Sequence, residues 1–195
     1  MKHVVIFIIC ATILFTLIPQ SYAELYYNEK YSFSVDIPNG WTVTDLGITD
    51  VGILICDGSE QLPLGMLDIG VWNTCIQINY YPDYGEKYSD TRERAIQIDY
   101  VRDLCVSATY SESRYTCENF QVVEKMPTAI TIDGYPRITT IYTETDYYPD
   151  YPVQDMVDTV SSIYVGNDEW DILTQSDSDV WGEHQSKVFH LINSF

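Results

Sequence analysis

Segments in which apolar and polar residues alternate run through most of this chain and limit the folds open to it. Residues 31–37 (YSFSVDI) show the pattern clearly, because an aromatic or aliphatic residue occupies every second position. A period of two places these residues on one face of a half-buried strand. Further strands are predicted at residues 41–43, 51–55, 66–72, 75–81, 118–124, 129–132, 135–145, 157–165 and 170–174, with turns at residues 38–40 and 133–134. The series indicates an antiparallel sheet.

Two segments change to the spacing of three and four residues that is typical of an amphipathic helix. The first helix is predicted over residues 90–108, with Asp90 and Glu93 as a capping box. The second ends the chain, and Ser178 or Asp179 is its expected N-cap. Their inward positions are Ile98, Val101, Cys105 and Ala108 in the first helix, and Trp181, His184, Val188, Leu191 and Phe195 in the second. A run of strands with one internal and one terminal helix predicts an α+β fold, with both helices layered on an antiparallel sheet.

The first residues have the composition of a secretory signal peptide. Lys2 and His3 precede an apolar run at residues 4–18, and residues 21–23 (SYA) approximate a cleavage site of small residues. The run is shorter than the roughly 20 residues that cross a bilayer. We therefore expect residues 1–23 to be removed, which leaves residues 24–195 as a single domain without a membrane span. Retention of the segment as an N-terminal anchor is the alternative.

The mature chain is strongly acidic. Because Lys2 is the only charged side chain in residues 1–23, nine Lys and Arg remain against 29 Asp and Glu, a net charge of −20. Phosphate backbones and anionic lipid surfaces repel such a chain, so no nucleic-acid partner is expected. The charge favours an extracellular cation or a basic protein partner, although a solvated acidic surface also explains it. The oligomeric state does not follow from it.

Four cysteines remain after the signal peptide, an even number in an exported chain. Four cysteines allow three pairings, and their order favours Cys56 with Cys75 across neighbouring strands and Cys105 with Cys117 between a helix end and the next strand. Thiolate coordination of zinc is the competing interpretation. It is disfavoured because the mature chain has no CxxC pair and only two histidines. Disulfides place the protein outside the cytoplasm, secreted or at the cell surface.

Three segments together resemble a known family. The opening YYNEKYSFSVDIPNGWTV, with its aromatic-rich strand, Pro38 and Trp41, resembles the start of PsbP-like domains, the superfamily of the extrinsic photosystem II subunit and the Ran-binding Mog proteins. The segment TAITIDGYPRITTIYT and the closing INSF are similar to later parts of that family. The resemblance covers residues 26–195 and implies a sheet with flanking helices and a role in binding or scaffolding. The export signal, cysteines and acidic loops indicate a secreted, non-photosynthetic member, so only the fold is transferred.

The pentapeptide YYPDY occurs at residues 80–84 and again at 147–151, each time after a predicted strand. Proline followed by aspartate suits a type I turn, so the same strand ending used twice is one interpretation. The other is that both loops meet at one edge of the sheet and bind a cation such as calcium, a sugar or a basic partner. The residues of this predicted site are Asp83, Glu86, Asp146 and Asp150 as metal ligands and Tyr81, Tyr84, Tyr148 and Tyr151 as partner-binding residues. Asp168, Glu169 and Asp171 form a further acidic cluster.

No segment carries a catalytic motif of comparable specificity. His184 lies on the apolar stripe of the last helix and is interpreted as a core histidine with a satisfied ring, and His190 is expected to be exposed. No phosphate-binding glycine loop, nucleophile elbow or HExxH motif occurs. The sequence therefore predicts a secreted, non-catalytic binding or scaffold module. An extracytoplasmic metal-dependent hydrolase that uses the acidic loops, and a structural envelope component without a ligand, are the alternatives.

Overall fold

The computed structural model describes residues 23–45, 51–57, 74–84, 89–110, 116–125, 129–147 and 152–195. The strands are β1 (Glu24–Asn28), β2 (Phe33–Ile37), β3 (Trp41–Asp45), β4 (Val51–Asp57), β5 (Thr74–Tyr81), β6 (Thr116–Lys125), β7 (Ala129–Ile130), β8 (Pro136–Tyr147), β9 (Gln154–Val165) and β10 (Asp168–Asp177); the helices are α2 (Asp90–Tyr110) and α3 (Ser178–Ser194). The predicted strand at residues 66–72 and residues 1–22 of the predicted signal peptide lie outside these ranges. The other predicted elements are present.

One antiparallel sheet dominates the fold, as predicted. Its strand order is β3-β4-β5-β10-β9-β8-β6, and β7 pairs with β8. The turn at Gly40 (φ 82°) leads into β3 and the turn at Gly134 (φ 89°) leads into β8, and both glycines adopt the left-handed backbone that these turns need. A separate hairpin is formed by β1 and β2. Strand β1 was not predicted. Its exposed positions hold the apolar residues Leu25 and Tyr27, so apolar character does not follow burial along this strand.

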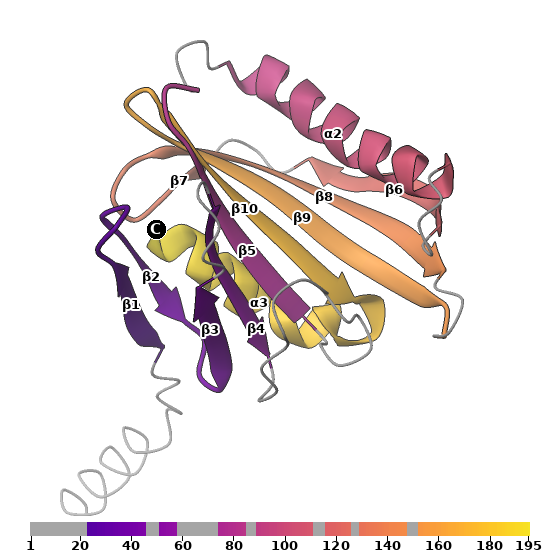
Figure 1. The fold of residues 1–195 in the computed structure, drawn as a ribbon, viewed down its shortest axis with the longest axis horizontal. Coiled ribbons are helices and arrows are strands. Elements are labelled where there is room, and N and C mark those ends of the chain that lie inside the picture. Colours follow the sequence, from indigo (N-terminus) through magenta and orange to yellow (C-terminus); the bar gives the residue numbers. More distant parts are fainter. Residues whose placement is uncertain are drawn as a thin grey trace, which may run out of the picture.

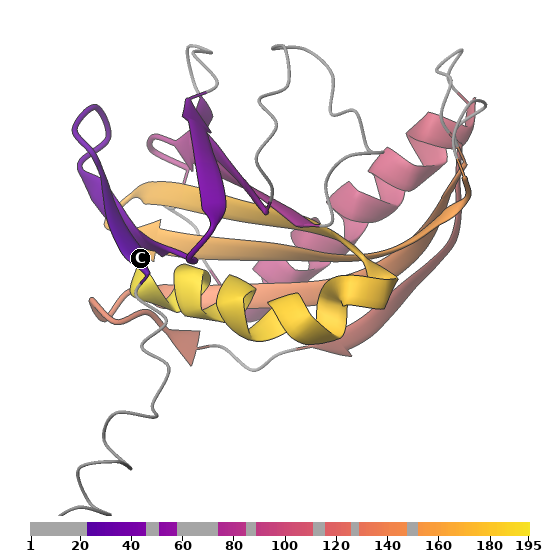
Figure 2. The ribbon, with the colours of Figure 1, turned by 90° about the horizontal axis from the view of Figure 1, so that it is seen from below.

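The two helices lie on opposite faces of the sheet. Helix α3 and the β1–β2 hairpin cover one face, whereas α2 runs along β6 and β8 on the other (Figure 1). Figure 2 shows the central strands between the two helices. None of the helices in the described ranges combines the length and apolar character needed to cross a bilayer. The sheet is therefore a platform with two differently covered faces.

The face under α3 holds the main hydrophobic core. Ile76 and Ile78 of β5 and Trp170 of β10 pack there with Phe33 of β2 and Leu191 of α3. The predicted common face of the alternate β5 residues is confirmed, because Ile76 and Ile78 are fully buried in this core and Tyr80 packs against it. The opposite positions of the same strands are mostly polar. Helix α2 packs on this polar face over β6 and β8. It does not cover all of the face over β5 and β10.

The N-cap residue of each helix differs from the predicted one. Ser89, rather than Asp90, caps α2, because its hydroxyl accepts a hydrogen bond from the backbone N–H of Arg92 at 3.4 Å. Asp177 caps α3 by accepting from the N–H of Asp179 at 2.8 Å. The predicted caps were wrong because several adjacent Ser and Asp residues satisfy the same local rule. Glu93 therefore does not cap α2, and its side chain is buried.

Two disulfide bonds join the predicted pairs. Cys56 and Cys75 are directly opposite each other in β4 and β5, with Cα atoms 4.2 Å apart. Cys105 of α2 and Cys117 of β6 have Cα atoms 5.0 Å apart, and their bond ties the helix to the sheet. Disulfides persist in oxidising compartments, so both pairs indicate an extracytoplasmic environment.

Replacing Cys105 and Cys117 together by serine is expected to lower the free energy of unfolding by about 3 kcal/mol, because the bond closes a loop in the unfolded chain. Urea unfolding without reductant measures the loss. Mass spectrometry of the unreduced protein tests the bonds themselves, since two disulfides remove two hydrogen atoms each. Thiols that react with an alkylating agent in the unreduced, denatured protein would contradict the pairing.

Candidate functional site

The two copies of YYPDY begin at opposite ends of the sheet. Strands β5 and β8 are separated by β10 and β9, and every neighbouring pair is antiparallel, so β5 and β8 run in opposite directions. Tyr81 at the end of β5 is opposite Glu169, at the end of the sheet where β8 begins. Tyr147 is the last residue of the 12-residue strand β8, which spans roughly 35 Å. The strands that lead into the two loops therefore end at opposite ends of the sheet.

This arrangement excludes one ion shared by Asp83 and Asp146, two of the four predicted metal ligands. Asp83 follows β5, whereas Asp146 pairs with Gln154 near the end of β8. No single ion contacts carboxylates at both ends of a sheet, because calcium holds its ligands at about 2.3–2.6 Å. Glu86, Asp150, Tyr148 and Tyr151 lie outside the described residues. Calcium binding by either loop alone stays a prediction.

The first copy forms a tight strand ending held by Asp168. The hydroxyl of Tyr80 donates to one oxygen of the Asp168 carboxylate at 2.9 Å, and the backbone N–H of Asp83 donates to the other at 3.1 Å. Asp83 has a φ of 60°, which excludes the predicted type I turn, because that turn needs a negative φ at its third residue. Because side chains alternate along β5, Tyr80 packs on the α3 face and Tyr81 lies on the opposite face.

Tyr81 stands on the rim of a cavity between α2 and the sheet, which we call the acidic pocket. Its volume is about 190 Å³. Glu93 of α2 and both Glu169 and Asp171 of β10 line it. The remaining lining residues are the tyrosines Tyr81, Tyr84 and Tyr100, the polar residues Gln97 and Ser162, and the apolar residues Ile96 and Val160.

Hydrogen bonds hold the floor of the acidic pocket in place. The Tyr164 hydroxyl donates to Oε1 of Glu169 at 3.2 Å, and the Ser162 hydroxyl donates to Oδ1 of Asp171 at 2.7 Å. Gln97 donates to Ser162 at 3.0 Å, which connects α2 to this floor. Glu169 is 3% exposed, yet no described N–H or O–H donates to its Oε2 atom. The pocket thus contains a buried carboxyl oxygen with unused acceptor capacity.

The electrostatics of the pocket favour the uncharged forms of its acids. Burial, with the neighbouring Asp171, raises the pKa of Glu169 to about 7. Burial also raises the pKa of Glu93 and that of Asp171. At the rim, burial followed by the charge of Asp171 raises the pKa of Tyr81 to about 12. Burial is the largest cause of all four shifts. Because a nearby positive charge favours the ionised form of an acid, a bound cation would stabilise the ionised carboxylates.

Sequence reasoning found part of this pocket. It selected Tyr81 and Tyr84 as binding residues and grouped Glu169 with Asp171, but it assigned Glu93 to a cap. Two signals point to the pocket in hindsight. Glu93 and Gln97 continue the buried i, i+4 stripe of Val101 and Cys105, and the acids alternate with Trp170 along a strand, which places them on the face opposite the core. The predicted Ile98 is only half-buried, and the side chain of Ala108 lies outside the described set.

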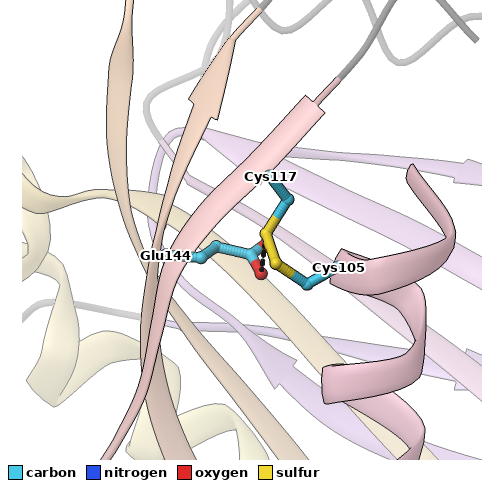
Figure 3. A group of neighbouring side chains, drawn as sticks. All are labelled: Cys105, Cys117 and Glu144. Atoms are coloured by element: carbon cyan, nitrogen blue, oxygen red, sulfur yellow. Dashed lines mark hydrogen bonds between the residues drawn. A yellow bond between two sulfur atoms is a disulfide. The ribbon is translucent and has the colours of Figure 1, made fainter. Parts of the chain in front are cut away.

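A second group of acids is buried beside the Cys105–Cys117 disulfide. Sγ of Cys117 lies 3.1 Å from Oε2 of Glu144 (Figure 3). A disulfide sulfur carries no hydrogen, so this contact is a hydrogen bond only when the Glu144 carboxyl is protonated. Asp158 is completely buried nearby, and burial followed by the charges of Glu144 and Asp146 raises its pKa well above the ordinary value. Asp146, a predicted metal ligand, belongs to this buried group.

Metal coordination has little geometric support in the described ranges. Among them, only Cys105, Cys117 and Glu144 place their ligand atoms within 4.8 Å of one another. The disulfide bond occupies both sulfur atoms, which then cannot act as thiolate ligands. In the oxidised protein this group is structural.

His184 joins a buried polar network rather than an accessible catalytic group. Its Nδ1 lies 2.7 Å from the Thr74 hydroxyl, which in turn lies 2.7 Å from the Ser176 hydroxyl. Its Nε2 faces Asp57 at 3.7 Å. The arrangement resembles a hydroxyl–histidine–carboxylate relay, but Thr74 is 1% exposed and Ser176 is fully buried. A substrate cannot reach either hydroxyl, so the interpretation of His184 as a core histidine is confirmed. His190 is exposed, as expected.

The fold and the site define an α+β protein with a mainly antiparallel sheet and an acid-lined cavity beneath its internal helix. No protein-family model matches the sequence, and no curated protein matches it. Among solved structures, the chain is similar to cyanobacterial PsbP from Synechocystis sp. PCC 6803, with 14% identity, a TM-score of 0.52, and coverage of 91% of this chain and 94% of that chain. It is also similar to the Ran-binding protein Mog1p of Saccharomyces cerevisiae, with 13% identity, a TM-score of 0.46, and coverage of 88% and 93%. The predicted PsbP-like fold is confirmed.

Proposed function

We propose that this protein is an extracytoplasmic, non-catalytic binding module that receives a basic group of a protein partner in the acidic pocket. The observation that carries the proposal is the buried Glu169 carboxyl, which lines the cavity together with Glu93 and Asp171 and has an oxygen that no described donor uses. Buried acceptors cost free energy unless a partner satisfies them, so an incoming donor gains more here than on an exposed acidic surface.

Three further features support this proposal. The disulfides fit an exported protein, and the predicted signal peptide at residues 1–23 would direct its export. The chain is acidic throughout, so a basic partner is attracted from a distance before it reaches the pocket. Half-exposed tyrosines on the rim provide rigid contact area at low entropic cost.

The geometry gives no comparable support to the hydrolase alternative. Carboxylates that share a catalytic ion hold their oxygens close together. Glu93, Glu169 and Asp171 are not among the described groups whose ligand atoms lie within 4.8 Å. The hydroxyl groups near His184 are buried, as described above. A binding role requires neither closely spaced carboxylates nor an accessible hydroxyl group.

Binding of a fluorescent decalysine peptide tests the proposal. The double variant Glu169→Gln, Asp171→Asn is expected to weaken binding at least about tenfold, because a hydrogen bond to a charged group contributes about 1.5–3 kcal/mol. The matched control is Glu118→Gln, Asp133→Asn, which removes the same charge from two exposed positions. Equal losses in both variants, or no binding to the wild-type protein, would refute a role for the pocket.

A further inference from the structure

The acidic pocket has the size of one side chain. Sites for drug-sized ligands occupy roughly 300–1,000 Å³, whereas this cavity holds about 190 Å³. It is also too wide for a bare metal ion to contact all three acids. Calcium oxygens lie about 2.3–2.6 Å from the ion, so ligand atoms stay within about 5 Å of one another. A cation that donates hydrogen bonds at 2.7–3.2 Å reaches acceptors that are farther apart.

The acceptors surround the cavity rather than lying along one plane. Glu93 approaches from α2, and Glu169 and Asp171 occupy alternate positions of β10. An ammonium group has three N–H donors that point in different directions, whereas guanidinium is a planar fork that matches one carboxylate best. Three carboxyls on two elements therefore suit an ammonium group better than a guanidinium group.

The rim supplies aromatic surface next to these acceptors. The Tyr81 and Tyr84 rings have centroids 6.0 Å apart, and Tyr100 lines the cavity from α2. Aromatic rings attract cations within about 6 Å and also pack against methylene groups. A lysine side chain presents both parts, a charged tip and an apolar stem.

The acids of the pocket hold at least one proton when it is empty of cations. Glu169 and Asp171 line the same small cavity from alternate positions of β10, and burial raises the pKa of both carboxyls, so that this pair binds a proton at pH 6.5. The titratable or charged groups that face this pair are Glu93, Tyr164, Tyr81 and Tyr100, with Arg92 next to Glu93. The tyrosines are neutral at physiological pH, so Arg92 is the only positive charge in this set. An entering ammonium ion would replace this proton.

From these observations we infer that the pocket binds one alkylammonium group, as carried by a lysine side chain, and that each binding event releases a proton from the Glu169–Asp171 pair to solvent. The inference rests on the proposed function and adds the chemistry of the ligand to it. The exchange is balanced in charge: one cation enters and one proton leaves, with no covalent change.

Calorimetry with N-acetyl-lysine amide tests the ligand class. We expect binding at least about tenfold tighter than that of N-acetyl-arginine amide and of the uncharged N-acetyl-norleucine amide. Titrations at pH 6.5 in two buffers with different heats of ionisation give the number of protons released, which we expect to be close to one. Equal affinity for the three amides, or no proton release, would overturn the inference.

Two comparisons separate this inference from the proposed function. Tyr84→Leu is expected to weaken binding of the lysine amide about two- to fivefold, the range for an exposed cation–ring contact. Tyr27→Leu, which changes a similarly exposed tyrosine on β1, is the control and should leave the affinity unchanged. If decalysine and decaarginine bind equally and both need Glu169, the alkylammonium inference fails while the proposed function stands. If neither peptide binds, both fail.

Discussion

The free energy of unfolding is expected to fall as the pH rises from 5 to 8, by several kcal/mol in total. Four carboxyls, those of Glu93, Asp158, Glu169 and Asp171, have pKa values that burial raises in the folded protein. A raised pKa means that the folded state binds the proton more tightly than the unfolded state. The stabilisation is complete below the unfolded pKa and is lost as the pH rises through the folded pKa. For Glu169 that window runs from about 4.5 to about 7.

Glu169 alone is expected to contribute on the order of 2–3 kcal/mol to this loss. Urea unfolding at four pH values measures the trend, and repetition at high salt removes the part caused by repulsion among exposed charges. Asp158→Asn should raise stability at pH 8 and flatten the profile, because its side chain needs no proton to stay uncharged. Asp133→Asn, at an exposed turn, is the control. Stability that increases between pH 5 and 8 would contradict the assignment of these buried acids.

Trp170→Ala is expected to lower the free energy of unfolding by about 3–5 kcal/mol, the range for a large aromatic residue removed from a core. Trp170 is 4% exposed, and its ring centroid lies 4.5 Å from that of Tyr80, 4.8 Å from that of Phe33 and 5.2 Å from that of Phe195. The side chain thus joins the sheet to both the β1–β2 hairpin and the C-terminal helix.

Urea unfolding followed by circular dichroism measures this loss. Trp181→Ala is the matched control, since Trp181 is only partly buried on α3 and packs against Phe189 at 6.2 Å between centroids. We expect it to cost about 1 kcal/mol. If both variants lose the same stability, the core is not centred on Trp170.

Much of the fold follows from local patterns. The alternation in residues 31–37 predicted β2, and the helical spacing of Val101 and Cys105 predicted α2 with its inward stripe. The cysteine pairing was also predictable, because consecutive cysteines on neighbouring elements are brought close by short connections. Strand β1 and both helix caps were not, because exposed apolar residues and adjacent Ser or Asp residues give no unique local signal.

The candidate site could be predicted only in part. The tyrosines of the first YYPDY copy and the Glu169–Asp171 pair stood out in the sequence, since aromatic and acidic residues cluster there. Glu93 is 76 residues before Glu169 in the chain, and it joins the pocket only because of where α2 crosses the sheet. No local spacing in the sequence encodes that crossing. Packing of α2 against β6 and β8, with the Cys105–Cys117 bond, sets it.

The type of each element, the faces of the strands and the acidic character of the protein were contained in the amino-acid sequence, because periodicity and charge are local properties. The structural role of each YYPDY copy was not contained in the sequence. Two strands that separate β5 from β8 give them opposite directions, so identical strand endings stand at opposite ends of the sheet. One copy therefore forms the rim of a cavity with residues from α2 and β10, a consequence of long-range strand order that identical local sequence cannot specify.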